Sequence, residues 1–216
     1  MQRATGPASH RWRGGKTITS DGYVNIRVLL MVFAMSKIRS GFREWADHSA
    51  NWMLGCSSGC RYCWAAALAR RYGWLRQKGV SEKGEEIVCE RPWTEMRVRP
   101  RMLTKRWKKL DGVVAAPTTH DITPETVGPC ARVLHNILSA GNRVLITTKP
   151  HEAVVRELCL GLHGLAEWRD NVQFRFTIGS DVDAILRYWE PGAPGFDERM
   201  RSLQLAFETG YRTSVS

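Results

Sequence analysis

The sequence predicts an α/β fold built on parallel strands. From residue 111 onward, short apolar runs rich in β-branched residues alternate with stretches of helical periodicity, and Gly or Pro stands at the joints. Successive strands begin about 30 residues apart, which is the length of one βαβ unit, so neighbouring strands are expected to be parallel. The chain has 216 residues, 43% of them hydrophobic, which is enough for one domain with a full core.

Five strands are expected in this sheet. The first is a short apolar run upstream of the regular part, at residues 51–55. The other four expected strands are residues 112–116, 143–148, 172–178 and 211–215. A helix is expected after each strand except the last, which meets the end of the given sequence.

Helices are predicted in the connections between these strands. Residues 62–74 are rich in Ala and Leu and predict the first helix. Three later helices are predicted from apolar residues at helical spacing. Those stripes are Val127, Ala131, Leu134 and Leu138; Val154, Val155, Leu158, Leu162 and Leu165; and Met200, Leu203 and Phe207. Gly141 and Gly210 stand where C-terminal caps belong.

Two segments do not follow the βα pattern. Residues 79–110 are expected to be an irregular, basic excursion between the first helix and the second strand. Residues 1–34 are expected to be a separable basic extension, with Asp21-Gly22 as the turn of a hairpin over residues 16–28. The expected βα domain is therefore residues 35–216.

Basic residues are concentrated in two places. The formal net charge is +11, and residues 1–43 and 91–109 each hold eight basic and one acidic residue. The rest of the chain is close to neutral. Basic segments on a near-neutral domain suit an anionic partner such as nucleic acid, and a solvated basic surface is the competing interpretation.

No membrane partner and no secretory signal are expected. The longest apolar stretch, residues 28–35, has eight residues. A membrane-spanning helix needs about 20. The stretch also lacks the flanks of a secretory signal. The sequence therefore predicts a cytoplasmic protein, in which the six cysteines are ligands or free thiols rather than disulfides.

Three of the cysteines stand close together. Cys56, Cys60 and Cys63 have the spacing C-x3-C-x2-C between the first expected strand and the first expected helix. The positive end of a helix dipole stabilises anionic sulfur, and thiolates select zinc or iron–sulfur centres. An iron–sulfur cubane usually takes four cysteines, so three in one loop would leave one iron open for another ligand.

This loop resembles the radical S-adenosylmethionine superfamily, whose signature is C-x3-C-x-aromatic-C, with Tyr62 in the aromatic place. The resemblance implies a [4Fe–4S] cluster held by Cys56, Cys60 and Cys63, with S-adenosylmethionine on the open iron. It also implies an electron donor and a reductive cleavage that gives methionine and a 5′-deoxyadenosyl radical. That radical would abstract a hydrogen atom from a substrate.

Later segments resemble the spore photoproduct lyase-like branch of this superfamily. They are residues 118–125, 143–150, 174–180, 189–194 and 211–216, so the resemblance covers roughly residues 42–216. It implies a lyase-like enzyme with a partial parallel (β/α) barrel, truncated after about the fifth of the six strands of the family. The Gly-Gly-Glu that ends the second strand in many members is replaced here by Thr118, Thr119, His120 and Asp121.

Polar residues follow the expected strands at their C-terminal ends, where sites assemble in α/β folds. The residues expected to bind S-adenosylmethionine or substrate are Tyr62, Thr118, His120, Asp121, Lys149, Thr177, Ser180 and Ser214. A turn or helix cap is the competing role for any single one of them. No catalytic residue is assigned.

Other readings stay open. DNA or RNA is a candidate partner, because the lyase-like branch includes DNA repair and because of the two basic segments. Trp93 and Trp107 within the second basic segment could stack on bases, although core packing is the simpler role. One alternative function is a basic, zinc-stabilised nucleic-acid-binding protein with Cys89 or a histidine as fourth ligand. Another is a cluster-binding but inactive fragment.

Overall fold

The computed structural model describes residues 41–163 and 166–216. The chain divides into two units, residues 1–39 and 40–216, and the second contains the described residues. The expected hairpin at residues 16–28 and the expected extension over residues 1–34 lie outside the described residues. Among the described residues, no helix is long and apolar enough to cross a membrane.

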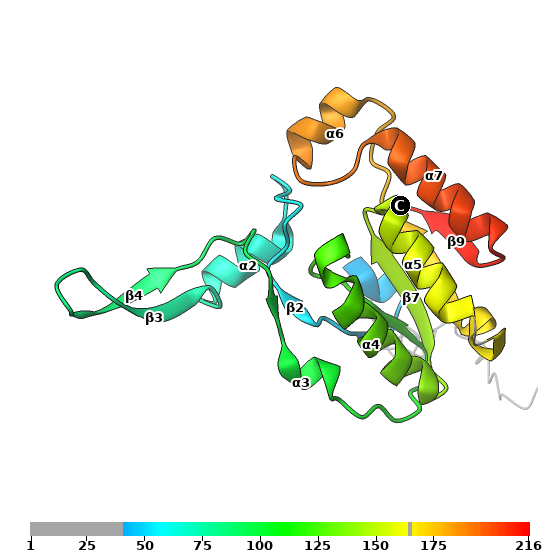
Figure 1. Ribbon diagram of the computed structural model, residues 1–216, viewed down its shortest axis with the longest axis horizontal. Coiled ribbons are helices and arrows are strands. Elements are labelled where there is room, and N and C mark those ends of the chain that lie inside the picture. Colours follow the sequence, from blue (N-terminus) through cyan, green and yellow to red (C-terminus); the bar gives the residue numbers. More distant parts are fainter. Residues whose placement is uncertain (1–40, 164–165) are drawn as a thin grey trace, which may run out of the picture. The chain divides into compact units, whose positions relative to one another are not determined.

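A five-stranded parallel sheet forms the centre of the second unit (Figure 1). Its strands, in spatial order, are β1 (His48–Ser49), β6 (Val113–Ala115), β7 (Arg143–Thr148), β8 (Val172–Phe176) and β9 (Arg212–Val215). Every neighbouring pair is parallel. The predicted α/β class with parallel strands is therefore confirmed, and four of the five strands lie where the sequence places them.

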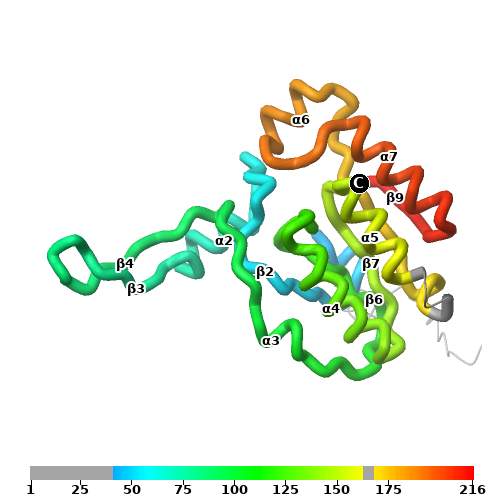
Figure 2. Tube along the Cα trace, viewed as in Figure 1, coloured from blue at the N-terminus to red at the C-terminus, as the bar shows by residue number. Residues whose placement is uncertain are grey.

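Three helices pack beside this sheet and supply about half of the main hydrophobic cluster. They are α4 (Val127–Ser139), α5 (Glu152–His163) and α7 (Phe196–Glu208), and α5 packs against both others (Figure 2). On β8, Val172, Phe174 and Phe176 are buried and belong to the main hydrophobic cluster with α4 and α5, while Gln173 and Arg175 point to the other face. This alternation follows from the two-residue period of a strand.

The segment between β1 and β6 carries a second, smaller cluster. The regular elements of this segment are β2 (Met53–Leu54), α2 (Trp64–Arg71), β3 (Arg76–Val80), β4 (Glu86–Glu90), β5 (Arg97–Val98) and α3 (Pro100–Leu103). The cluster consists of buried Cys56, three alanines of α2, Leu75 and Trp93. Short 3₁₀ turns η1 (Gly41–Glu44), η2 (Pro124–Thr126) and η3 (Ala166–Asn171), together with α6 (Asp183–Trp189), complete the elements.

The expected first strand is wrong in position. Residues 53–54 form β2, which pairs antiparallel with β5, whereas the strand that joins the parallel sheet is β1, at His48–Ser49. The apolar run was misleading because Trp52 and Met53 are buried by packing and not by membership of the sheet. The sheet therefore begins before residue 51, and residues 79–110 contain part of a hairpin, a short strand and a helical turn.

The expected inner stripe of α7 is wrong for two of its three residues, because Leu203 packs against the main cluster but Met200 and Phe207 do not. Met200 is 40% exposed and Phe207 is 69% exposed, whereas Arg199, Ser202 and Ala206 are buried. Burial of Arg199 is possible because its guanidinium donates a hydrogen bond of 2.6 Å to the carboxylate of Glu190. The buried face of α7 thus contains an ion pair where an apolar contact was expected. Helical periodicity cannot reveal such a pair.

The sheet is open in the part of the chain that the structure describes. β1 and β9 are the two ends of the strand order, and each pairs with one neighbour only. The finer expectation, a partial barrel of the radical S-adenosylmethionine type, stays a prediction.

Candidate functional site: a cysteine loop beside a buried charge pair

The three clustered cysteines lie in the loop between β2 and α2, past the end of β1 where the parallel strands finish. Two glycines shape this loop. Gly55 has φ +98°, and a Cβ there would lie 2.5 Å from the Glu95 carbonyl oxygen, so the backbone passes too close for any other residue. Gly59 has φ +58° and turns the chain between Cys56 and Cys60. We call residues 56–63 the cysteine loop.

Two of the loop sulfurs accept hydrogen bonds from backbone N–H groups. Cys56 Sγ accepts from Asp121 N at 3.4 Å, and Cys63 Sγ caps α2 by accepting from Ala66 N at 3.4 Å. Backbone donors and a helix start are the surroundings that favour thiolate. All six cysteines are free thiols.

Burial opposes ionisation of the inner thiols in the absence of a bound ligand. Desolvation raises the pKa of Cys56, and the negative charge of Asp121 raises it further. Desolvation also raises the pKa of Cys60, to about 11, although the Lys149 ammonium acts in the opposite direction. Both thiols are therefore protonated at neutral pH, and a cation that binds them must displace protons.

Asp121 is the buried centre of the site. Its carboxylate accepts hydrogen bonds from Ser58 Oγ at 2.7 Å and from Lys149 N at 2.8 Å, and Lys149 Nζ lies 3.5 Å from it. Burial alone would raise the pKa of Asp121, but the Lys149 charge and these donors outweigh burial and hold the pKa below its usual range. The carboxylate is therefore ionised.

Lys149 joins Asp121 to a second buried carboxylate. Its Nζ lies 3.9 Å from Glu190 Oε1, and Glu190 also pairs with Arg199, whose side chain is fully buried. Burial lowers the pKa of Lys149, but the charges of Asp121 and its other anionic neighbours outweigh this effect and raise the pKa above its ordinary value. The site thus holds two buried carboxylates and two cations in one network.

The segment that ends α6 clamps the cysteine loop. Arg61 N donates to Trp189 O at 2.9 Å, Gly192 N donates to Ser58 O at 3.0 Å, and the Tyr62 hydroxyl donates to Glu190. In Figure 1 the loop before α2 lies beside α6 accordingly. We call residues 188–192 the clamp segment, because its backbone and Glu190 fix the loop from one side.

Exposed aromatic rings surround this contact. Tyr62, Tyr188 and Trp189 are each about half exposed, with ring centroids 6.4 Å apart for Tyr62–Trp189 and 5.1 Å apart for Tyr188–Trp189. The Arg61 guanidinium lies 4.5 Å from the Tyr188 ring. Exposed aromatic side chains beside buried charges can hold a planar, polar ligand.

The side chains near the cysteine loop bear on the expected metal site. Among the described residues, no three His, Cys, Asp or Glu side chains are arranged so as to hold a metal ion. Cys56, Cys60 and Cys63, which the resemblance makes the cluster ligands, are thus not arranged as a metal site in the structure described here. In its chemistry the donor set fits an iron–sulfur centre, because one short loop carries three reduced thiols, two of them already accepting backbone N–H bonds.

Of the predicted site residues, Tyr62, Asp121 and Lys149 are brought together with the cysteine loop. Lys149 Nζ lies 5.9 Å from the centre of the Tyr62 ring. Thr118 precedes Asp121 by three residues, but its backbone N and its Oγ1 form hydrogen bonds with the Asn51 side chain. His120 is buried edge-on against Trp52, and its Nε2 has no hydrogen-bond partner among the described residues.

The remaining predicted residues serve neighbouring strands and turns. Ser180 Oγ accepts from Val182 N at 3.0 Å just before α6. Thr177 O accepts from Arg199, and Ser214 Oγ contacts Gln173 and Arg175 on β8. Ser180 therefore serves a turn, which is the competing role expected from the sequence. Ser214 bonds within the sheet, and the contact of Thr177 with Arg199 uses the backbone carbonyl.

Sequence reasoning missed Ser58, Thr148, Glu190 and Arg199 as site residues. Ser58 lies inside the cysteine loop, and Thr148 directly precedes Lys149, so adjacency was an available signal. Glu190 and Arg199 gave none, because the contact between Glu190 and Tyr62 joins residues 128 positions apart.

Comparison with known proteins gives one distant relative. The chain is 28% identical over 207 residues to an uncharacterized protein, ORF301, of Acidianus two-tailed virus. The match covers 91% of this chain and 64% of the viral protein, so the chain spans less than two thirds of that relative. No model of a known protein family matches the chain, and no solved structure matches it.

Proposed function

We propose that this protein is a radical S-adenosylmethionine enzyme in which Cys56, Cys60 and Cys63 hold a [4Fe–4S] cluster. The observation that carries the proposal is the juxtaposition of three free thiols in one loop with the buried Asp121–Lys149 pair. The loop signature with Tyr62 in the aromatic place adds to it. When bound, the cluster supplies one electron that splits the sulfonium of S-adenosylmethionine.

The residues of this chain suit the other parts of that cofactor. Its amino-acid end carries an ammonium and a carboxylate, for which Asp121 offers a buried carboxylate and Lys149 a partly buried ammonium. Its adenine is planar, and the half-exposed rings of Tyr62 and Trp189 offer a surface for stacking. The chain would therefore bind and orient, while the cofactor carries the hard chemistry.

The clamp segment would give the loop its rigidity. Glu190 binds both Tyr62 and buried Arg199, so it links the loop to the first turns of α7. A preorganised loop is needed because a cluster ligand displaced by an ångström loses its function. Burial of Cys56 and Asp121 would also exclude water from the reacting centre.

The test is anaerobic reconstitution with iron and sulfide, followed by addition of S-adenosylmethionine and a strong reductant. We expect a brown protein with about four irons per chain and formation of 5′-deoxyadenosine. Alanine at Cys56, Cys60 or Cys63 should abolish both the colour and the product. Cys89→Ala is the matched control, because Cys89 is a free cysteine outside the loop, on β4.

Two results would overturn the proposal. A colourless protein that retains stoichiometric zinc, and loses it in Cys89→Ala, would favour the zinc-stabilised alternative. A brown protein that forms no 5′-deoxyadenosine would leave a cluster-binding protein without the proposed reaction.

A further inference from the structure

A groove with cationic walls lies at the end of the sheet where the strands begin. It has a volume of about 670 Å³, and its cations are Arg43, Lys105, Arg106 and Lys108. Asp47 is the single carboxylate among the described residues that line it, and Trp107 supplies an aromatic wall. We call it the basic groove.

The backbone that carries three of these cations, Lys105, Arg106 and Lys108, is held in place although it has no regular structure. Residues 105–110 form neither helix nor strand. The side chain of buried Asn142 donates to Lys108 O at 3.1 Å and accepts from Leu110 N at 2.7 Å, and Asn136 on α4 donates to Leu103 O at 2.9 Å. The segment is thus anchored through its backbone, which leaves the basic side chains to face solvent.

The cations of the groove are not neutralised within the described part of the chain. None of the four forms an ion pair there, and all four are exposed. Lys105 Nζ lies 3.7 Å from the centre of the Trp107 ring, and one carboxylate oxygen of Asp47 accepts from Val113 N at 3.0 Å. Clustered cations with one engaged carboxylate create a positive potential that a polyanion would relieve.

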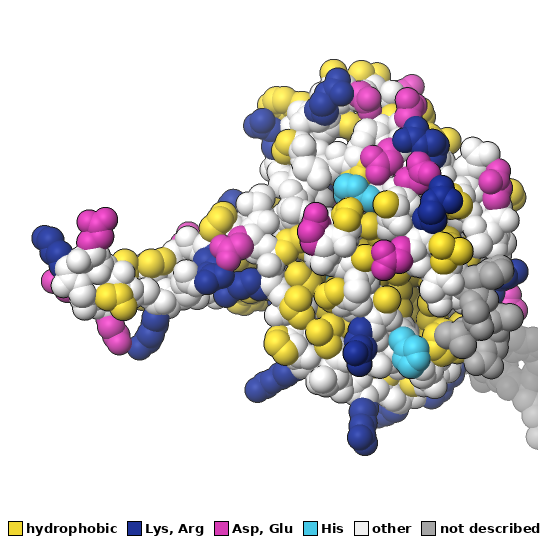
Figure 3. Space-filling model, in the orientation of Figure 1, with side chains coloured by type: hydrophobic (Ala, Val, Ile, Leu, Met, Phe, Trp, Pro, Cys, Tyr) yellow, Lys and Arg dark blue, Asp and Glu magenta, His cyan; other side chains and the backbone are white. Residues whose placement is uncertain are grey.

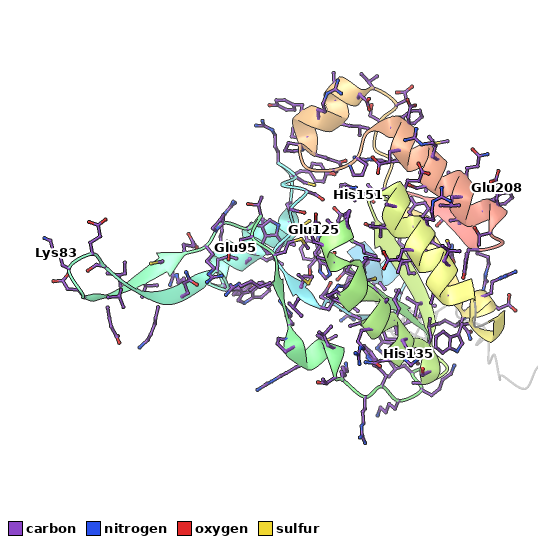
Figure 4. All side chains as sticks on the ribbon, viewed as in Figure 1. Lys83, Glu95, Glu125, His135, His151 and Glu208 are labelled. Atoms are coloured by element: carbon purple, nitrogen blue, oxygen red, sulfur yellow. The ribbon has the colours of Figure 1, made fainter. Side chains whose placement is uncertain are left out.

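The groove and the cysteine loop lie at opposite ends of the parallel sheet. Residues 105–110 precede β6, whereas Asp121 follows it and contacts the cysteine loop. Figure 4 marks the two ends by Glu125 and His151, where α4 and α5 begin, and by His135 towards the other end of α4. In Figure 3, basic side chains project along the edge formed by α3 and the chain that follows it. An anion in the groove is therefore remote from the thiols.

We propose that the basic groove binds the phosphate backbone of a single-stranded nucleic acid, as an anchoring site separate from the cysteine loop. Four exposed cations suit a chain of regularly spaced phosphates, and Trp107 together with Phe42 gives the groove apolar wall against which bases can pack. This inference goes beyond the proposed function and does not depend on it, since it concerns the protein without any cluster.

The test measures binding of a fluorescently labelled oligothymidine of about 20 nucleotides by anisotropy, across a series of salt concentrations. In the full chain, Arg43→Gln, Lys105→Gln and Lys108→Gln are combined. Counterion release predicts a log–log slope that is less steep by about 2, because each phosphate contact on a single strand contributes about 0.7. At low salt the affinity should fall by about ten-fold or more.

A charge-matched control uses the hairpin of β3 and β4. Arg76→Gln, Lys78→Gln and Lys83→Gln remove the same number of charges from exposed positions outside the groove, and Figure 4 labels Lys83 at the hairpin tip. This variant should bind like the parent protein. An equal loss in both variants would reduce the effect to net charge and overturn the proposal.

Competition identifies the class of partner. Unlabelled oligothymidine should displace the probe, whereas polyglutamate of the same charge should be at least about ten-fold weaker, because it offers no bases for stacking. Equal competition by polyglutamate would assign the groove to acidic proteins. Since no cluster is present, failure here leaves the proposed enzyme activity untouched, and failure of 5′-deoxyadenosine formation leaves this proposal untouched.

Discussion

Single residues at the site are governed by burial, and His120 and Asp121 respond to it in opposite ways. Both are 7% exposed. Asp121 stays charged because Lys149 and three hydrogen-bond donors compensate its desolvation. His120 has no such compensation, and burial together with the Arg99 charge lowers its pKa to about 3, against the opposing charge of Asp121. Asp121 is therefore a buried charged group, and the adjacent His120 is a buried neutral ring.

This difference predicts how stability changes with acid. The folded-state pKa of His120, about 3, lies below its ordinary 6.5, so the unfolded chain binds the proton first. The stability that His120 confers is complete above pH 6.5 and is lost as the pH falls towards 3, by up to about 1.4 kcal/mol per pH unit. In His120→Gln, the unfolding free energy should therefore fall less steeply between pH 6.5 and 4.5.

Urea titrations at several pH values measure this slope. His135→Gln, at an exposed position on α4, controls for the loss of an imidazole at the surface. Parallel slopes for the parent protein and His120→Gln would show that His120 is not the acid-sensitive group.

At the scale of elements, the clamp segment depends on a close approach that only glycine permits. A Cβ on Gly192 would lie 2.3 Å from Ser57 O and 3.1 Å from Ser58 Cα, and backbone atoms cannot move aside cheaply. Gly192→Ala should lower the unfolding free energy by about 1–3 kcal/mol. It should also speed alkylation of Cys56 and Cys60, because the loop loses part of its cover.

Gly161→Ala on α5 is the matched control, since no atom of the described residues lies within 4 Å of the added carbon. It should raise the unfolding free energy by up to about 1 kcal/mol, through helix propensity alone, and leave the alkylation rates unchanged. Unaltered stability and alkylation in Gly192→Ala would mean that the loop does not rest on the clamp segment.

The elements also show what sequence patterns can and cannot reveal. The strands at residues 143–148 and 172–176 are buried on one or both faces, so their apolar runs identified them. The β3–β4 hairpin escaped because β3 reads Arg-Gln-Lys-Gly-Val and both of its faces are open to solvent, which removes any two-residue hydrophobic alternation. The parallel strand β1 escaped because two polar residues form it.

The site was predictable to the extent that its residues adjoin recognisable elements. The cysteine spacing and the strand ends located Asp121 and Lys149, because both follow strands of one parallel sheet. Glu190 and Arg199 were not predictable, because helical spacing predicts that apolar residues are buried. Here the charged pair is buried, whereas Met200 and Phe207 are exposed. Buried ion pairs of this kind leave no trace in the periodicity of a single sequence.

At the scale of the whole described unit, folding rests on two hydrophobic clusters, and the β3–β4 hairpin belongs to neither. None of residues 76–90 is a member of these clusters, and no residue of β3 or β4 is buried. Figure 1 shows the hairpin extending away from the sheet. Its exposed Val80 and Val88 are therefore not accounted for by the stability of the fold.

Shortening the hairpin tests this separation. Gln77 and Cys89 are directly paired, so replacing residues 78–88 with Asn-Gly closes the strands through a two-residue turn. The unfolding free energy in urea should change by less than about 1 kcal/mol, because the removed side chains bury no core. Oligothymidine binding should also persist, because the basic groove lies in other elements. A loss of several kcal/mol would instead show that the hairpin is part of the folding unit. The amides of the hairpin would then exchange as slowly as those of the central strands, whereas a solvated arm exchanges fast.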